Sequence, residues 1–143
     1  MECYIDTDFA GGWDKKDTDN PTAVMSRTGY VLMFCGCPLI WCSKIQSEIA
    51  LSIIEAEYIA LNQATREGLP MMELLKEINE VFSLNLASPK IHCKFYEDNE
   101  SFISLAKTQR FSPRTKYIAI KHHHFRSHVN NGSLVIFGIE TKE

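Results

Sequence analysis

The chain has 143 residues, of which 45% are hydrophobic and 23% charged, a composition typical of one folded domain and not of a disordered chain. Its net charge of −3 argues against a strongly basic nucleic-acid binder. No stretch approaches the roughly 18 apolar residues of a membrane span, and the first residues, MECYIDTDFA, do not resemble a signal peptide. Five cysteines without a secretory signal favour reduced thiols inside the cell. We therefore expect a single intracellular domain over residues 1–143, with no membrane partner.

The first part of the chain contains five expected elements in order. Alternating apolar and polar residues predict strands, the 3.6-residue period predicts helices, and Gly and Pro mark the breaks between them. The helical pattern is expected to break near Gly68, where GLP interrupts it. The expected elements are a strand at 3–10, strands at 28–36 and 38–46 joined by a turn at 36–38, a helix at 52–67 and a second helix at 71–82.

The second part alternates between strands and helices. It contains an expected strand at 90–97, a short helix at 98–107 capped by Asp98 or Asn99, a helix at 113–132 and a strand at 133–140. Three antiparallel strands followed by alternating helices and strands predict an α/β fold. We expect a five-stranded mixed sheet flanked by helices.

Charge is segregated along the chain. Residues 1–100 contain 16 acidic and 8 basic residues, whereas residues 101–139 contain no Asp or Glu and four of the five histidines. An acid-free basic stretch indicates either a phosphate-binding face or a solvated helix face, and charge alone does not separate the two. Its Lys and Arg residues are Lys107, Arg110, Arg114, Lys116, Lys121 and Arg126.

Two glutamates of the 52–67 helix have different surroundings. At about 100° per residue, Glu57 falls inside the apolar stripe of this helix, whereas Glu55 falls on its polar flank. An ionised carboxylate turned toward a core is costly unless something compensates it. Either Glu57 reaches solvent or a Lys at the edge of the stripe, or other acids converge with it around a shared cation.

Acidic residues also stand at two strand ends. Asp6 and Asp8 are two residues apart on the first strand, and Asp98 follows the fourth. Taken alone, Asp98 is better explained as a helix cap. The expected topology, however, places these strand ends near the first helix and Glu57. Ionised carboxylates at such short distances repel one another, and an oxygen-preferring divalent ion such as Mg²⁺ relieves the repulsion.

Several motifs occur together in a fixed order, among them YIDTDFAGG, LIWCSKIQ, EAEYIAL, YEDN and PRTKYIAIKHHHFR. Each is weak alone, but the combination is specific. From Tyr4 to about Thr141 the chain resembles the ribonuclease H domain of copia-type (Pseudoviridae-like) LTR retrotransposon Pol polyproteins. The resemblance implies a ribonuclease H-like fold. Matched residue by residue, it assigns Asp6, Glu57 and Asp98 as the catalytic, metal-binding carboxylates.

The resemblance also implies a reaction and its partners. The reaction is hydrolysis of the RNA strand of an RNA–DNA hybrid at a two-metal Mg²⁺ site, in which Mn²⁺ can substitute. In a full element the reverse transcriptase domain of the same polyprotein would be a partner, and the protein would lie in the cytoplasm, in a virus-like particle, or in the nucleus. We expect four residues to contact the substrate backbone, namely Asn99, Arg114, Lys116 and Lys121.

The sequence departs from the family pattern in several places. The family's fourth active-site Asp belongs to a Q-x-A-D motif beyond the fifth strand, and a last helix follows it, so we expect a C-terminally truncated domain that lacks both. Glu100 stands where Gln is usual, and Ala119 where Asp is common. These departures predict weak or absent cleavage with retained hybrid binding. The alternatives to an active nuclease are a catalytically impaired nucleic-acid-binding remnant and a structural remnant without activity.

Overall fold

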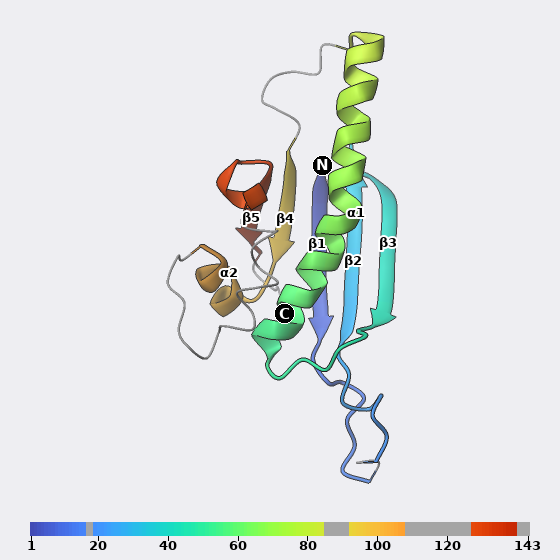
Figure 1. The fold of residues 1–143 in the computed structure, drawn as a ribbon, viewed down its shortest axis with the longest axis vertical. Helices are drawn as coiled ribbons and strands as arrows, with labels where there is room; N and C mark the ends of the chain where they lie inside the picture. Colours follow the sequence, from blue (N-terminus) through green and yellow to red (C-terminus); the bar gives the residue numbers. More distant parts are fainter. Residues whose placement is uncertain (17–18, 85–91, 108–126, 140–143) are drawn as a thin grey trace.

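The structure is a computed structural model that describes residues 1–16, 19–84, 92–107 and 127–139. In these ranges a five-stranded sheet has the strand order β3-β2-β1-β4-β5, and α1 crosses one of its faces (Figure 1). The elements are β1 (Glu2–Asp8), β2 (Arg27–Phe34), β3 (Cys37–Ile45), α1 (Ile53–Phe82), β4 (Cys93–Glu97), α2 (Glu100–Lys107) and β5 (Leu134–Gly138).

The sheet is mixed, as the order of elements predicted. β1, β2 and β3 form an antiparallel meander, whereas β4 runs parallel to β1 and β5 parallel to β4. In the parallel register Tyr4 of β1 lies beside Tyr96 of β4. Because β1 and β4 are parallel neighbours, their carboxyl ends lie at the same end of the sheet. This places Asp6 of β1 near Asp98, which follows β4.

The β2–β3 hairpin turns slightly earlier than the sequence indicated. Cys35 and Gly36 form the turn, with φ angles of 51° and 79°, and Cys37 already pairs with Phe34. Two central residues with positive φ are characteristic of the tight hairpin turn whose twist matches that of the strands. The hairpin is confirmed, but its turn lies at residues 35–36 and not at 36–38.

α1 is one continuous helix of 30 residues, so the predicted break near Gly68 is wrong. Pro70 lies inside the helix with its side chain exposed, where it removes one backbone donor. The apolar stripe continues beyond it, because Gly68, Met72 and Leu75 are all buried. Burial of this face outweighs the local cost of the proline.

The start of α1 separates the roles of its two early glutamates. Ser52 is the N-cap and accepts a hydrogen bond from the Glu55 amide at 3.2 Å, while Glu55 Oε2 accepts one from the Leu51 amide at 2.9 Å. This arrangement is similar to a capping box, except that Glu55 accepts from the amide of Leu51, one residue before the N-cap. Glu55 therefore serves the helix terminus, and Glu57 is buried with 4% of its surface exposed, as the helical periodicity predicted.

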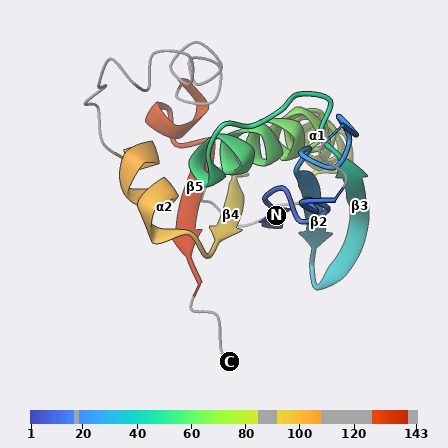
Figure 2. The same ribbon diagram turned by 90° about the horizontal axis from the view of Figure 1, so that it is seen from below.

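The two faces of the sheet differ in cover. On β1, Cys3 and Ile5 are buried on the face beneath α1, whereas Tyr4 and Asp6 are exposed on the opposite face. Figure 2 shows α1 lying across one side of the sheet. No helix of the described ranges covers the other side. The largest fully buried apolar side chains are Phe95, Phe102, Leu32, Leu61, Met72 and Leu134.

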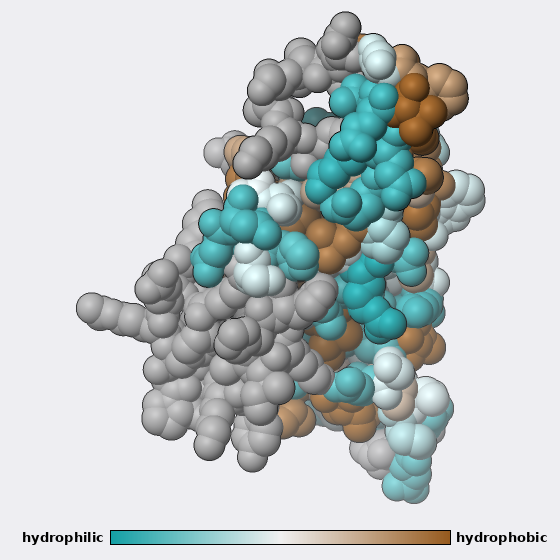
Figure 3. All heavy atoms as spheres, turned by 45° about the horizontal axis from the view of Figure 1, so that its top comes forward, coloured by the Kyte–Doolittle hydropathy of each residue, from teal (hydrophilic) through white to brown (hydrophobic). Residues whose placement is uncertain are grey.

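The outer side of α1 is polar. Figure 3 shows hydrophilic residues along this helix, and apolar residues gather near its end, where Val81 and Phe82 are exposed. Such a distribution is typical of a helix that packs on a sheet with one face only. Among the helices that the structure describes, none has the length and apolar character needed to cross a membrane.

Asn99 is the residue that caps α2, because its Oδ1 accepts a hydrogen bond from the Phe102 amide at 3.0 Å. This decides between the two caps that the sequence left open. Most of the helix expected over 113–132 lies outside the described residues. Within the described residues, 127–130 form a helical turn, and the chain leaves it through Asn131 and Gly132, whose φ is 76°. The Asn-Gly end predicted for that helix is therefore confirmed.

Candidate functional site

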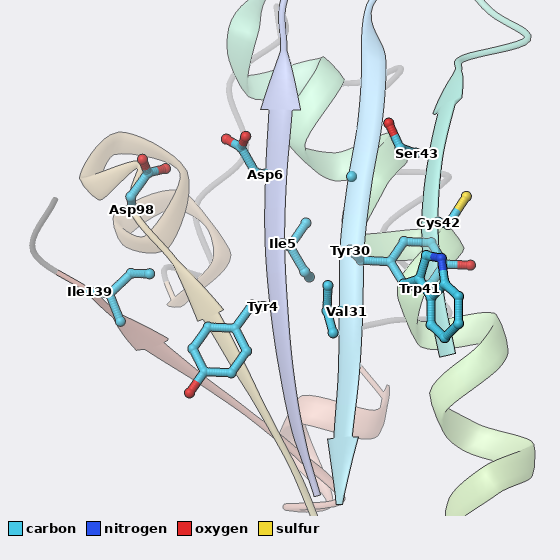
Figure 4. Close-up of a pocket in the computed structure, with 11 residues that line it drawn as sticks. Tyr4, Ile5, Asp6, Tyr30, Val31, Trp41, Cys42, Ser43, Asp98 and Ile139 are labelled. Carbon is cyan, nitrogen blue, oxygen red and sulfur yellow. The ribbon is translucent and has the colours of Figure 1, made fainter. Parts of the chain in front are cut away.

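Two of the predicted acids lie at one end of an open groove on the uncovered face of the sheet. Asp6 comes from β1 and Asp98 directly follows β4, and both side chains are exposed. Figure 4 shows their carboxyl groups at the same end of this groove, which has a volume of about 710 Å³. Its other lining residues include Tyr4, Val31, Trp41, Ser43 and Ile139.

A row of mostly aromatic side chains lies in register across all five strands on this face, and three of its members, Trp41, Val31 and Tyr4, line the groove. Tyr4 and Tyr96 are stacked with ring centroids 4.8 Å apart, and Trp41, on the outer strand, is 72% exposed. The register from β3 to β5 gives the order Trp41, Val31, Tyr4, Tyr96, Phe137. Asp6 and Asp98 therefore border a flat, largely aromatic surface.

Glu57 approaches the same sheet end from the helix side. Burial is the main cause that raises the pKa of its carboxyl group to about 7; the Thr7 hydroxyl opposes this rise, and the nearby charges of Asp98 and Asp6 add to it. Thr7 is only a neighbour, since its Oγ1 has no hydrogen bond of standard geometry among the described residues. Glu57 Oε2 is buried and has no hydrogen-bond partner there either. Burial, and only to a lesser extent repulsion between the acids, therefore sets the raised pKa of Glu57.

The three acids share one end of the sheet without forming one ready set of ligands. Successive residues of β1 point to opposite faces, so Asp6 lies on the open face, whereas Thr7, the neighbour of Glu57, lies on the helix face. In the described ranges no group of three or more His, Cys, Asp or Glu side chains could hold a metal ion as they stand. The metal-binding role of Asp6, Glu57 and Asp98 stays a prediction.

A fourth acid, Glu97, belongs to this site and was missed by the sequence analysis. It is 1% exposed, and burial together with the charge of Glu57 raises its pKa to about 8. Its Oε1 accepts hydrogen bonds from the amides of Asp98 and Asn99, each at 3.2 Å, and its Oε2 has no partner among the described residues. The sequence did contain a signal for this. In the alternating strand CKFYE, Glu97 falls on the same face as Cys93, which is buried.

Gln46, the last residue of the LIWCSKIQ motif, fixes the start of α1 against the sheet. Its side chain is buried, and its Nε2 donates to Thr28 Oγ1 and to the carbonyl oxygen of Ala56, each at 3.0 Å. Its own amide donates to the Ser26 carbonyl at 2.8 Å. Because Ala56 directly precedes Glu57, this bridge sets the position of Glu57 relative to β2.

The predicted substrate-binding residues are only partly within the described ranges. Asn99 is half-buried and uses its Oδ1 as the cap of α2. Asp8, the second acid of the first strand, has its carboxylate against the backbone of Gly11. The other three predicted substrate contacts, Arg114, Lys116 and Lys121, lie outside the described residues.

Sequence comparison identifies full-length matches to parts of longer proteins. The chain matches no family model. Over 143 residues it is 35% identical to the retrovirus-related Pol polyprotein from transposon TNT 1-94 of Nicotiana tabacum, covering 100% of this chain and 10% of that protein. It is 30% identical over 143 residues to the corresponding polyprotein from transposon RE1 of Arabidopsis thaliana, covering 100% of this chain and 9% of that protein. The chain thus spans about a tenth of these relatives.

Structural comparison identifies the fold. The crystal structure of LC11-RNase H1 in complex with RNA/DNA hybrid matches with a TM-score of 0.56 and 19% sequence identity, over 98% of this chain and 85% of that one. At this identity the likeness concerns the fold alone. The chain is therefore a homologue, along its whole length, of one segment of the retrovirus-related Pol polyproteins of plant copia-type transposons, and it has the ribonuclease H-like fold that its motifs predicted.

Proposed function

We propose that the chain is a ribonuclease H that hydrolyses the RNA strand of an RNA–DNA hybrid with the help of divalent cations. The observation that carries the proposal is Glu57, a carboxyl group with 4% exposure and one oxygen that has no partner among the described residues, at the sheet end that carries Asp6 and Asp98. Burying an ionised carboxylate is costly unless hydrogen bonds, an opposite charge or a metal ion compensate it. The homology to Pol polyproteins and the hybrid-bound relative of the same fold support the assignment.

The residues at this sheet end fit Mg²⁺ or Mn²⁺ in their chemistry. Asp6, Glu57 and Asp98 supply only carboxylate oxygens, which hard divalent cations prefer, and the buried Oε2 of Glu57 lacks another partner among the described residues. When bound there, a pair of such ions would stabilise the charge that develops on the attacking water and on the leaving oxygen. Because the pKa of Glu57 is about 7, its carboxyl group must lose a proton at neutral pH to serve as a ligand.

Substrate would be held by two parts of the chain. A nucleic-acid backbone that lies across this end of the sheet would enter the open groove and meet Asp6 and Asp98, which border it. The basic stretch at 101–139 would bind phosphates, with Arg114, Lys116 and Lys121 as its sequence-based candidates and Asn99 close to Asp98. Contacts to the 2′-OH would distinguish RNA from DNA. In a full polyprotein, the reverse transcriptase domain would be the partner that delivers the hybrid.

The test of this function is cleavage of an RNA–DNA hybrid whose strands carry different labels. We expect weak Mg²⁺- or Mn²⁺-dependent cleavage of the RNA strand only, with 5′-phosphate and 3′-hydroxyl ends, because water attacks and the 3′-oxygen leaves. A DNA duplex of the same sequence is the control and should stay intact. Cleavage that persists in EDTA, or products ending in a 2′,3′-cyclic phosphate, would contradict the proposal, since the latter requires attack by the RNA's own 2′-OH.

The second candidate is a module that binds hybrid without cutting it. It is favoured by the finding that, within the described ranges, no three acids form a set able to hold a metal as they stand. Phosphate contacts need no metal ligand, so binding would survive and would weaken steeply with salt. Binding with a steep salt dependence but no RNA fragments at any Mg²⁺ or Mn²⁺ concentration would decide for this candidate.

A further inference from the structure

Glu97 makes contacts that differ from those of the other acids at this sheet end. Its side chain turns back on its own chain, where Oε1 accepts from the amides of Asp98 and Asn99 at 3.2 Å each. The residue is 1% exposed and lies on the helix face of β4, in alternation with Cys93 and Phe95. A buried carboxyl group thus takes both hydrogen bonds from the main chain that carries Asp98.

The segment that Glu97 holds is the connection from β4 to α2. On its far side Asn99 caps α2 through the Phe102 amide. The carbonyl oxygen of Glu97 accepts a hydrogen bond at 3.0 Å from the amide of Ile139, beyond β5. The connection is therefore fixed by the neighbouring strand, by the helix cap and by the Glu97 side chain, and only the last of these binds the amide of Asp98 itself.

We propose that Glu97 is the positioning residue of Asp98: its carboxyl group fixes the main chain of residues 98 and 99 so that the Asp98 side chain stays at the groove end beside Asp6. The role rests on the proposed nuclease function, in which Asp98 acts directly. Glu97 acts through Asp98 and needs only an acceptor oxygen at Oε1, not a charge. Glutamine supplies the same acceptor in the same shape, whereas leucine has a similar volume and no acceptor.

The first test does not depend on activity. Amide hydrogen exchange of Asp98 and Asn99 is measured by NMR in the wild type, Glu97→Gln, Glu97→Leu and the control Glu100→Leu, which changes an exposed Glu at the start of α2. Both amides should be protected in the wild type, in Glu97→Gln and in Glu100→Leu. In Glu97→Leu they should exchange about tenfold faster, as expected for loss of one hydrogen bond of ordinary strength. Unprotected amides in the folded wild type would overturn the proposal, even if Glu97→Leu fails to fold.

The second test is the kinetics of hybrid cleavage by the same variants. Glu97→Leu should lower kcat and leave KM unchanged, because the substrate contacts of the basic stretch remain, and Glu97→Gln should restore kcat. An equal loss in Glu97→Gln and Glu97→Leu would show that the charge matters and would overturn the positioning role. If the wild type cleaves nothing, the nuclease function fails, while the exchange rates still decide whether Glu97 fixes this main chain.

Discussion

The carboxyl groups of Glu57 and Glu97 are buried on the same side of the sheet, close enough that the charge of Glu57 raises the pKa of Glu97. One comes from the first turns of α1 and the other from the last residue of β4. Each has one oxygen without a hydrogen-bond partner among the described residues. Both groups therefore favour the protonated state in the folded protein, with pKa values of about 7 and about 8.

The pair predicts how stability depends on pH in the absence of metal. The pKa values of Glu57 and Glu97 are raised above the model-peptide value of roughly 4.3 that applies to the unfolded chain. Between these values the folded state binds more protons, so the free energy of unfolding should decrease as pH rises from 5 to about 8 and level off above that. The slope should approach about 1.4 kcal/mol per pH unit for each group. Urea unfolding in EDTA measures it.

The control for this experiment is the double variant Glu57→Gln with Glu97→Gln, which removes both titrations. Its free energy of unfolding should vary much less over the same pH range. A wild-type stability that rises from pH 5 to pH 9 would contradict the burial of these two groups as protonated acids.

Mg²⁺ should stabilise the protein and release protons on binding. A cation held by the ionised form of Glu57 displaces the proton that this group carries near its pKa of about 7. We expect millimolar Mg²⁺ to raise Tm, by mass action on the folded state. Calorimetry at pH 6.5 in two buffers of different ionisation enthalpy should show proton release. Both effects should be absent in Glu57→Gln and present in Glu55→Gln, whose glutamate serves the helix cap. A Tm indifferent to Mg²⁺ in the wild type would count against the cation site.

The bridge from Gln46 should contribute measurably to stability. Gln46→Leu leaves Thr28 Oγ1 and the Ala56 carbonyl without this buried donor, at an expected cost of about 1–3 kcal/mol in the free energy of unfolding. Thr28→Val removes one of the two acceptors. In a double-mutant cycle the two changes should cost less together than the sum of the single costs. Additive costs would show that the Gln46–Thr28 hydrogen bond contributes nothing.

Strand alternation and helical periodicity account for most of what the sequence predicted correctly. The five strands and the inward position of Glu57, as opposed to Glu55, follow from periods that depend only on local geometry. The continuity of α1 through Pro70 does not follow from local geometry. It depends on how much of the helix after Pro70 is buried against the sheet. A proline in the sequence therefore predicts a helix break too strongly where burial of the following turns compensates the cost of the proline.

The relation between the acids was predictable only in part. Their common sheet end follows from the parallel pairing of β1 and β4. That Asp6 and Glu57 lie on opposite faces depends on the path of α1 across the sheet, which no local pattern specifies. Glu97 was missed for another reason. The motif directed attention to the following Asp98, although the alternation of β4 already placed Glu97 inward with Cys93.

The continuity of α1 is itself testable at Pro70. Because Pro70 is exposed within an unbroken helix, Pro70→Ala restores a backbone donor without disturbing the core. The gain from removing an interior proline is about 3 kcal/mol, and the more flexible unfolded chain offsets up to about 1 kcal/mol of it. We expect a net stabilisation of about 2–3 kcal/mol in urea unfolding, with unchanged or slightly higher helical circular dichroism. A destabilised variant would indicate that the helix ends at Pro70.

The central claim, that the sheet end carrying Asp6 is a hydrolytic site, is tested most directly by one pair of variants. Asp6→Asn and Asp8→Asn change exposed acids two residues apart on β1, of which only Asp6 lines the groove. The measurement is the rate of RNA-strand cleavage in a labelled hybrid with Mg²⁺ or Mn²⁺, at protein concentrations that saturate binding. We predict weak, metal-dependent cleavage by the wild type and by Asp8→Asn, as the departures from the family pattern indicate, and its loss in Asp6→Asn with hybrid binding retained. Equal cleavage by Asp6→Asn and the wild type, or a wild type that binds hybrid and never cuts it, would contradict the account.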